Sequence, residues 1–575
     1  MSESLRQEWQ ASTRAEQLLL VMLACTAALH FVFAFALPVR GFDANVHLDW
    51  LAEFSELWHG GVWYPRWLPH EFGGLGAGTF YLYPPLLAFF GALLRGLVPN
   101  IDAIRQFQVL QVLISISAVA TCLLYLRSYK ISRLAALAAS LLFGFSSPGF
   151  HAIFMASSLG QHLSFVWVPL IFWSIDISLR GIQQDRATNL RCFVFSSLSW
   201  ALLILTNVPA SIIMSLVVPF YYFAHRKNWR SIWPSIIGAI FALLLAAAFT
   251  LPIAQFSPLF QTDQLFKHSV APLVKWDNQL EGLVRSDVPK SISIEIGVWM
   301  FVLSSFVCYL LYKLRSKLSE QFDREAAAAW VFVGCVLLFF QIPRISTPFW
   351  KYIPLVKYLQ FTWRFTLLLP LVSAVLYALL SKASVVESQR LRKQAIGVIL
   401  ILASLSFGCY LRYGYVVLLW PPPPPAVEEA RIGAGEHLPT TAPDFLEAKA
   451  YARLHLHDPF VLGPDSIRQQ IVLTHSEPNR RSLSVALTTN ANVTLHQFYW
   501  PMWKLYRGTE EIPTHADSLG LANANLLAGN YTLDYRLEKG WSEIWGARIS
   551  GVALLIWLIA ASISFVQMRR EPKHV

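Results

Sequence analysis

Long apolar stretches separated by short polar segments are the main pattern of this chain. A helix needs about 20 mostly apolar residues to cross a bilayer, and about twelve stretches here approach that length. They are continuous rather than alternating, which indicates helices and not strands. The predicted membrane spans cover residues 17–37, 107–126, 131–148, 162–179, 194–206, 209–224, 232–252, 295–313, 328–342, 363–380, 395–419 and 547–567.

The segment 80–98 decides the predicted topology. It is apolar but short, and it begins with Tyr83-Pro84-Pro85. If it does not cross the membrane, the short basic loops all fall on one side, together with both termini. The positive-inside rule requires that arrangement and assigns this side to the cytoplasm. We therefore predict cytoplasmic termini, and a helix at 80–98 that lies in the outer interface.

Four polar segments then fall on the outer side: a first loop at 38–106, two loops near 253–294 and 343–361, and a large segment at 420–546. The large segment opens with five prolines, which form a stiff extended spacer. Its later part alternates between apolar and polar residues, as half-buried strands do. We predict three parts.

These parts are a polytopic α-helical membrane module at 1–419, an antiparallel extracytoplasmic β domain of the sandwich type at 420–546, and a last transmembrane helix with its tail at 547–575.

Composition and charge agree with an integral membrane protein. The chain is 55% hydrophobic and only 14% charged. Its net charge of +11 is spread over short loops, so a nucleic-acid-binding surface is not expected. The six cysteines lie in or beside apolar stretches without a CxxC motif, which argues against a disulfide framework and a structural zinc site. The first apolar stretch is too long for a signal-peptide core, so we interpret it as a retained span.

The first loop holds the strongest candidates for chemistry. Asp43 and His47 are four residues apart, so they share a face if the segment after Asp43 is helical. A carboxylate at the outer interface could act as a general base, and with His47 it could hold a divalent cation. The alternative is that Asp43 only caps the helix that follows it.

Arginines and aromatic residues provide candidates for binding an anion. Arg66 lies among aromatic residues that suit either an interfacial belt or a lipid phosphate site. Arg364 begins a predicted span on the outer side, near Lys351 and Lys357, where positive charge is disfavoured unless it binds an anion or snorkels. Asn207 interrupts an apolar stretch, either as a plain turn or facing a cavity. The glycine run 73–78 lacks a Walker lysine, so it does not indicate nucleotide binding.

Several motifs together resemble a known family. They are GFDANVHLDWLAEF, GGVWYPRWLPHEFGGLGAG and FYLYPPLLAFF in the first loop, then WKYIPLVKYLQFTWRF and FYWPMWKLYRGTEEI. In these the chain resembles bacterial membrane proteins described as 6-pyruvoyl-tetrahydropterin synthase-related, a class related to the YfhO-like proteins. These resemble members of the GT-C glycosyltransferase superfamily. No zinc-binding histidine cluster of a pterin synthase is visible in the sequence.

The resemblance implies a GT-C-like fold and sugar transfer in a bacterial inner membrane. The donor would be a polyprenyl-phosphate-linked sugar, and the acceptor a glycan, a lipid or a protein on the outer face. Asp43, with His47 beside it, would act as base or orient the acceptor. The expected donor-phosphate and substrate-binding residues are Arg66, Arg364, Tyr83, Gln360 and Asn207.

The sequence does not decide whether the protein uses a metal, and it is compatible with two other functions. A divalent cation, Mg or Mn, would bind at Asp43 and His47 if the enzyme uses one. One alternative function is a transporter or flippase, which would need paired broken helices or charges inside the membrane. Another is a non-catalytic scaffold for envelope polysaccharide or lipid, with the β domain as its binding module.

Overall fold

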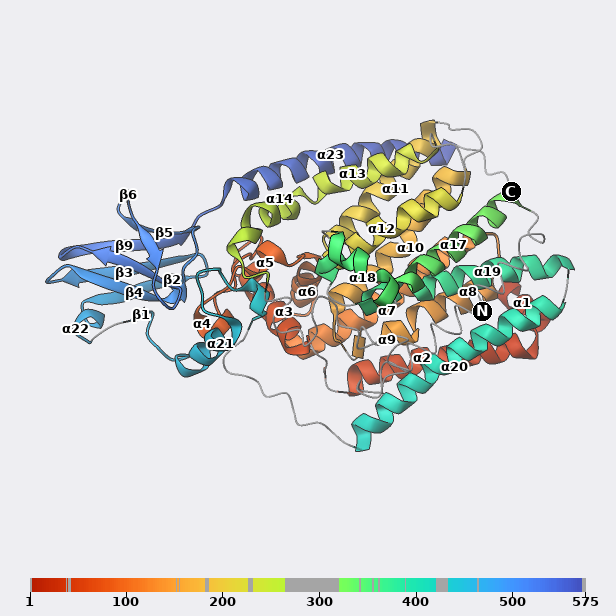
Figure 1. Cartoon of the computed structure of the whole chain (residues 1–575), viewed down its shortest axis with the longest axis horizontal. Helices are drawn as coiled ribbons and strands as arrows, with labels where there is room; N and C mark the ends of the chain where they lie inside the picture. Colours follow the sequence, from red (N-terminus) through yellow and green to blue (C-terminus); the bar gives the residue numbers. More distant parts are fainter. Residues whose placement is uncertain are drawn as a thin grey trace.

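A helical module and a β domain lie end to end, with the first loop between them (Figure 1). The computed structural model describes residues 3–37, 39, 43–150, 153–154, 156–180, 186–225, 231–263, 320–340, 343–353, 356–359, 362–387, 389–419, 433–462 and 465–570. The predicted span 295–313, most of the loop 253–294, the five-proline spacer and Gln360 lie outside the described residues.

Helices of different lengths, most of them apolar, make up the membrane module. They are α1 (Glu3–Ala11), α2 (Arg14–Ala36), α7 (Ala103–Arg127), α8 (Arg133–Gly144), α9 (Ser147–Phe150), α10 (Leu159–Arg180), α11 (Arg186–Ile204), α12 (Val208–Ala224), α13 (Trp233–Leu245), α14 (Ala247–Phe256), α17 (Gln321–Phe339), α18 (Pro343–Tyr352), α19 (Leu369–Glu387), α20 (Gln389–Leu419) and α23 (Trp541–Arg570). Short 3-10 turns lie at Ser257–Leu259 (η3), Val356–Leu359 (η5) and Thr362–Leu368 (η6).

In the part of the chain that the structure describes, fewer helices qualify as membrane spans than the sequence pattern predicts. Within the described residues, seven helices are long and apolar enough to cross a membrane, or eight if the pair α13 and α14, bent by 67°, counts as one. The predicted span 131–148 is a helix of only 12 residues, and 209–224 is one of 17. Both fall short of the about 20 residues that a straight crossing needs. The expected count of about twelve is not confirmed, whereas an integral membrane protein is.

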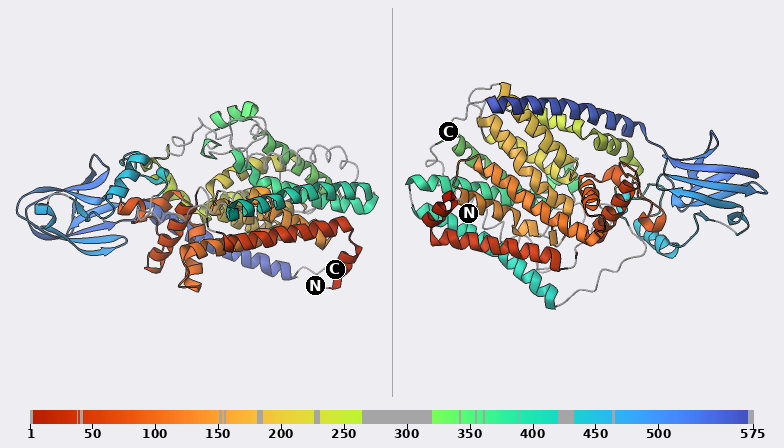
Figure 2. Two further views of the ribbon diagram at one scale, coloured as in Figure 1. Left: turned by 90° about the horizontal axis from the view of Figure 1, so that it is seen from below. Right: turned by 180° about the vertical axis from the view of Figure 1, so that it is seen from behind.

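Burial separates central helices from peripheral ones. The apolar part of residues 364–382 is 89% buried, whereas that of α23 is only 11% buried and faces outward. Figures 1 and 2 show α23 along one flank of the module, and α2 with α20 along the other. The N-terminal helix α1 and the C-terminal end of α23 lie at the end of the module far from the β domain.

The first loop folds into short helices at the junction of the two parts. These are α3 (Ala44–His59), α4 (Glu71–Gly74), α5 (Thr79–Leu82) and α6 (Leu86–Leu97). The predicted helix at 80–98 is therefore two short helices, separated at Tyr83-Pro84-Pro85. Its place in the outer interface remains a prediction.

The β domain contains two antiparallel sheets. One has the strand order β1-β4-β8-β7 and the other β2-β3-β9-β5-β6. The strands are β1 (Val461–Leu462), β2 (Ile471–Glu477), β3 (Arg480–Leu487), β4 (Ala491–Phe498), β5 (Trp503–Arg507), β6 (Glu510–Ile512), β7 (Thr514–Ala516), β8 (Leu521–Leu526) and β9 (Gly529–Leu537). Three short helical segments precede β2: η7 (Gly435–His437), α21 (Phe445–Leu454) and α22 (Asp465–Arg468). Both sheets contribute to one hydrophobic core.

That core also includes part of the first loop. Trp67, Phe72 and Leu75 are fully buried in it together with Phe498 and Trp500 of the β domain. The Phe498 N–H donates a hydrogen bond of 2.8 Å to the carbonyl of Leu75. The first loop, which the sequence pattern assigns to the membrane module, is thus shared between the two parts.

Candidate active site

Asp43 is the residue just before α3, and its side chain is exposed. Its backbone adopts φ −105° and ψ 6°, and its side chain makes no capping hydrogen bond. The Asp43 N–H instead donates to the carbonyl of Ala156, at 3.1 Å, which ties the start of α3 to the membrane module. The capping interpretation is therefore wrong for the side chain, which is exposed.

His47 lies one turn further along α3 and is buried. Its ring packs edge-on against Trp50 and Tyr83, with centroid distances of 5.6 and 5.8 Å. Burial lowers the pKa of His47, and the nearby Asp43 carboxylate only partly opposes this. The imidazole is therefore neutral near pH 7, and it can orient neighbouring groups without adding charge.

Tyr83 connects the first loop to two helices of the module. Its ring packs on Trp50 at 4.6 Å. A Cβ added to Gly160, at the start of α10, would lie 3.0 Å from the Tyr83 hydroxyl and 3.6 Å from Nδ2 of Asn207. Tyr83 and Asn207 therefore approach the same point. Burial and the Asp43 charge raise the pKa of Tyr83, so its hydroxyl remains a hydrogen-bond donor.

Asn207 is the N-cap of α12. Its Oδ1 accepts a hydrogen bond of 2.9 Å from the Ala210 N–H, which explains why the apolar stretch breaks there. The interpretation of this residue as a turn is confirmed. Its amide nitrogen still lies beside the Tyr83 hydroxyl, close to Gly160.

Arg364 brings a positive charge to the same region from η6. Its Nη1 donates to the carbonyl of Leu359 at 3.1 Å. Its charge interacts with those of Asp43 and Glu436 and with Tyr83. The side chains of Lys351 and Lys357 and the whole of Gln360 lie outside what the structure describes.

The polar segment before the β strands adds two residues that the sequence pattern does not indicate. Glu436 and His437 form the turn η7. Burial raises the pKa of Glu436, and the Asp43 charge raises it further while Arg364 opposes this. The His437 ring packs on Trp50 at 5.1 Å, and burial lowers the pKa of His437 to about 3.

This turn is held against the end of α14. The Gln261 N–H donates to the carbonyl of Leu438, and the Thr440 N–H donates to that of Leu259, both at 2.8 Å. In the sequence this turn is visible only as Glu436-His437 within the segment Gly435-Glu436-His437-Leu438-Pro439. The segment has no hydrophobic periodicity and matches no common motif.

Arg66 does not join this group. Its Nε lies 3.1 Å from Oε1 of Glu543 at the start of α23, and the two side chains are only 7% and 9% exposed. Its Nη2 donates to the carbonyl of Ala248 at 2.7 Å, and its guanidinium lies over the Tyr64 ring. The expectation that Arg66 binds a donor phosphate is not supported, because an internal carboxylate already neutralises the guanidinium.

The metal-binding side chains that the structure describes do not form a site for a resident metal ion. Of the residues that the structure describes, no three His, Cys, Asp or Glu side chains come together closely enough to hold one. Asp43 and His47 are thus at most two ligands, and His47 is buried among aromatic rings. No catalytic step is therefore assigned to a protein-held cation.

No protein-family model matches the sequence, and no curated protein is similar to it. Two solved structures are similar to the described fold. One is the cryo-EM structure of the arabinofuranosyltransferase AftD from Mycobacteria, with 15% identity and a TM-score of 0.43 over 70% of this chain. The other is a mutant of AftD in its class 2, with 17% identity and a TM-score of 0.42 over 69%. The present chain spans only 27% and 28% of their lengths.

Proposed function

We propose that this protein is a membrane glycosyltransferase that transfers a sugar from a polyprenyl-phosphate-linked donor to an acceptor on the extracytoplasmic face. The observation that carries the proposal is the convergence of Asp43, Arg364 and Glu436 from three distant parts of the chain. An exposed carboxylate beside a fixed guanidinium suits a reaction that removes a proton and releases an anionic phosphate. The resemblance of the first loop to GT-C enzymes supports the same reaction.

The transfer step needs a general base, a positively charged group and an acceptor that is held in position. The acceptor hydroxyl oxygen forms a bond to the anomeric carbon of the sugar, and its proton moves to the Asp43 carboxylate. The bond between that carbon and the phosphate oxygen breaks, and its electron pair leaves on the phosphate. Arg364 lies where it would neutralise this charge, since its charge already interacts with that of Asp43.

The neutral groups around Asp43 position the substrates. The Tyr83 hydroxyl and the Asn207 amide, which meet near Gly160, would donate to oxygens of the sugar or the phosphate. His47 and His437 flank Trp50 as neutral rings and keep that wall of the site in place. Burial raises the pKa of Glu436, which favours its neutral form and so lessens its repulsion of the phosphate.

Orientation follows from the charge of the loops. The basic loops predict that the end of the module with α1 faces the cytoplasm. The site lies at the opposite end, near the β domain (Figure 1). We place it on the outer side of a bacterial inner membrane, where a lipid-linked sugar can approach from the outer leaflet.

The test is transfer of a labelled sugar from a polyprenyl-phosphate donor by the full chain in proteoliposomes. We expect Asp43→Asn to lower the rate by about 10²–10⁴-fold, the range for loss of a general base. The control is Asp102→Asn. Asp102 caps α7 by accepting a hydrogen bond of 2.8 Å from the Arg105 N–H, a role that asparagine can also fill. A fully active Asp43→Asn protein would refute the mechanism.

A further inference from the structure

An arginine without a carboxylate partner lies inside the β domain. Arg481 is the second residue of β3, and it is only 9% exposed. Its Nη1 donates a hydrogen bond to Oε1 of Gln497 on β4, which is a neutral acceptor. Among the described residues, the titratable group whose charge acts on Arg481 is the Tyr535 hydroxyl, and no carboxylate does so.

The other basic residues of the β strands are paired. They form ion pairs with carboxylates at 2.6 to 3.6 Å: Arg480 with Asp534, Lys504 with Glu511, Arg507 with Glu510, and Arg536 with Asp534 and Glu538. All of these cations are more exposed than Arg481, so they need a countercharge less. A buried charge without a partner is strongly unfavourable, and an anion beside Arg481 would therefore be stabilising.

Arg481 keeps its charge in spite of its burial. Burial lowers the pKa of Arg481 to about 10, and Tyr535 opposes this only in part. Asp458 forms an ion pair of 2.7 Å with His455, and its charge acts on His496. Burial lowers the pKa of His496, so this neighbour adds no charge near pH 7. Arg481 thus supplies a single positive charge that no described group neutralises.

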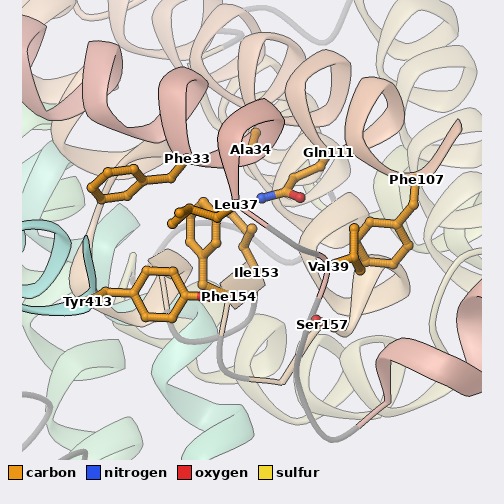
Figure 3. A pocket seen from close by; sticks show the side chains of 10 residues that line it. All are labelled: Phe33, Ala34, Leu37, Val39, Phe107, Gln111, Ile153, Phe154, Ser157 and Tyr413. Carbon is orange, nitrogen blue, oxygen red and sulfur yellow. The ribbon is translucent and has the colours of Figure 1, made fainter. Parts of the chain in front are cut away.

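A water molecule can satisfy a neutral buried donor, but it cannot neutralise a charge. Gln111 in the membrane module illustrates the neutral case. Its Nε2 has no hydrogen-bond partner in the described part of the chain, and Figure 3 shows it directed toward Leu37. The space beside it has room for about one water molecule, so no larger ligand is expected there. Arg481 differs because it lacks a countercharge.

One edge of the Arg481 guanidinium is left for a ligand. Gln497 accepts from Nη1, whereas Nε and Nη2 make no hydrogen bond with the described residues. Neither nitrogen belongs to the polar atoms that are fully enclosed without a partner, as Nη1 of Arg66 and Nε of Arg180 are. Both therefore keep contact with the surface. Because Nε and Nη2 lie on the same edge, they can donate two parallel hydrogen bonds to one carboxylate.

Aromatic rings hold the guanidinium in place. Its Cζ lies 4.4 Å from the ring centre of Phe460 and 5.6 Å from that of Trp503, which is fully buried. Gln497 is fixed as well, since its Nε2 donates to the Tyr535 hydroxyl at 3.4 Å. A side chain that is already ordered loses less conformational freedom when it binds a ligand.

Arg481 lies at the end of the β domain that is joined to the membrane module. It is opposite Tyr535 on β9, and this strand ends two residues later, shortly before α23 begins. Gln497 directly precedes Phe498, whose N–H is hydrogen-bonded to the carbonyl of Leu75 in the first loop. A ligand at Arg481 would thus lie close to the place where the first loop meets the β domain.

We propose that Nε and Nη2 of Arg481 bind the carboxylate of an acidic sugar unit in the acceptor glycan. A carboxylate is planar and carries one negative charge, so it matches both the edge of the guanidinium and its single positive charge. A phosphate dianion would leave an excess negative charge at a largely buried site. Placing the carboxylate on the acceptor glycan rests on the proposed function, whereas the carboxylate site depends only on Arg481 and its surroundings.

The binding test uses the purified full chain in nanodiscs and NMR titration with four probes: methyl glucuronide, its neutral methyl ester, acetate and inorganic phosphate. We expect methyl glucuronide to bind at least about tenfold more tightly than the ester, which cannot form charge-assisted hydrogen bonds. Equal binding of the ester would overturn the proposal. Binding of acetate or phosphate as tight as that of the glucuronide would do the same.

Substitutions of Arg481 test whether it is the site. Arg481→Met should abolish the preference for the glucuronide over its ester. Its melting temperature should be at or above that of the wild type, because an unpaired buried charge is replaced by an apolar side chain. Arg481→Lys keeps the charge but not the edge with two donors, so it should also lose most of the preference. This variant keeps the test valid if the methionine variant does not fold.

The matched control is Arg480→Gln. Arg480 is the neighbouring residue on β3, and it is exposed and paired with Asp534 at 2.7 Å. Its substitution changes the net charge by the same amount as Arg481→Met but should leave the preference for the glucuronide unchanged. An equal loss in both variants would indicate a general charge effect and overturn the proposal.

A transfer assay separates the failure of this site from the failure of the proposed function. An acidic acceptor should have a KM at least about tenfold lower than its methyl ester at similar kcat, and Arg481→Met should make the two KM values equal. Glucuronide binding without any transfer from a polyprenyl-phosphate donor would remove the proposed function and leave the carboxylate site. Transfer without any preference for an acidic ligand would remove the site and leave the function.

Discussion

The two halves of the first loop have similar composition but different roles. Both are rich in ionisable and aromatic residues. In residues 53–82 the buried charges are paired within the protein: Arg66 with Glu543, and Glu53 with the exposed His70. At Asp43 the carboxylate is exposed, and its neighbours come from three other segments.

The difference shows how to separate structural charge from functional charge in this molecule. A buried charge requires a matched partner, because desolvation would otherwise outweigh any gain. Arg66 and Glu543 satisfy each other and join the first loop to α23. The Asp43 carboxylate interacts with Arg364 through its charge, and Asp43 is exposed, which leaves it accessible to a substrate.

The largest expected effect on stability comes from residues 53–82 of the first loop, where the buried charges are paired. Arg66→Met should lower the free energy of unfolding by about 3–5 kcal/mol, because Glu543 would be left as a buried unpaired charge. The measurement is thermal unfolding in detergent, followed by tryptophan fluorescence of the β domain. The double variant Arg66→Met with Glu543→Leu should recover most of the loss. If the single variant melts like the wild type, the ion pair does not join the two parts.

A substitution of Arg364 should affect activity and not stability. Arg364→Gln should slow sugar transfer by about 10²–10³-fold, the loss expected for one group that stabilises a developing anion. Its melting temperature should stay near that of the wild type. The matched control is Arg95→Gln, because the contacts of Arg95 with Glu56 and with the Ala52 carbonyl are long, at 3.5 Å each, and its ion pair is partly exposed. Equal loss of activity in both variants would remove Arg364 from the mechanism.

Two glycines of the run 73–78 test how tightly the first loop packs on the β domain. Gly76 has φ +78°, and a Cβ there would lie 2.6 Å from the Trp67 ring. Gly74 has φ +96°, but a Cβ there would meet nothing within 4 Å. Gly76→Ala should therefore cost about 1–3 kcal/mol more than Gly74→Ala, which carries only the backbone penalty. Equal melting temperatures would mean that Trp67 can move aside.

The smallest expected effect is on the pH dependence of transfer. Because its pKa is raised, Glu436 keeps its proton at low pH and loses it as the pH rises through that value. The second negative charge beside Asp43 should then repel the donor phosphate, and the rate should fall about two- to fivefold, for a charge worth about 0.5–1 kcal/mol. Glu436→Gln should remove this decrease. Since the pKa values of His47 and His437 are lowered, these residues should not contribute to it.

Local geometry explains which site residues the sequence could indicate. Asp43 and His47 are one helical turn apart, and this spacing alone places them near each other. Arg364 stands out because a cation at the outer start of a span is unusual. Arg66 has equally suggestive neighbours, and only its contact with Glu543 reveals its structural role.

Other features of the site and the fold depend on contacts between residues far apart in the sequence, which no local pattern encodes. Glu436 and His437 reach the site because the segment before α21 is hydrogen-bonded to the end of α14. The expected count of about twelve spans is not confirmed, since two of the apolar stretches form helices of 12 and 17 residues, which are short for a straight crossing. Apolarity indicates burial, but it does not distinguish burial in lipid from burial in protein.

The sequence by itself determined a helical membrane protein with a β domain near its C-terminal end, since continuous apolar runs and period-two alternation are local properties of the chain. It also predicted that the first loop carries the chemistry, which stays a prediction. Only the tertiary structure decided how that loop divides. Part of residues 67–81 shares a core with the β domain, while the Asp43 charge interacts with Arg364 and Glu436. Which charges pair internally and which stay exposed depends on contacts between distant segments, and those contacts exist only in the folded chain.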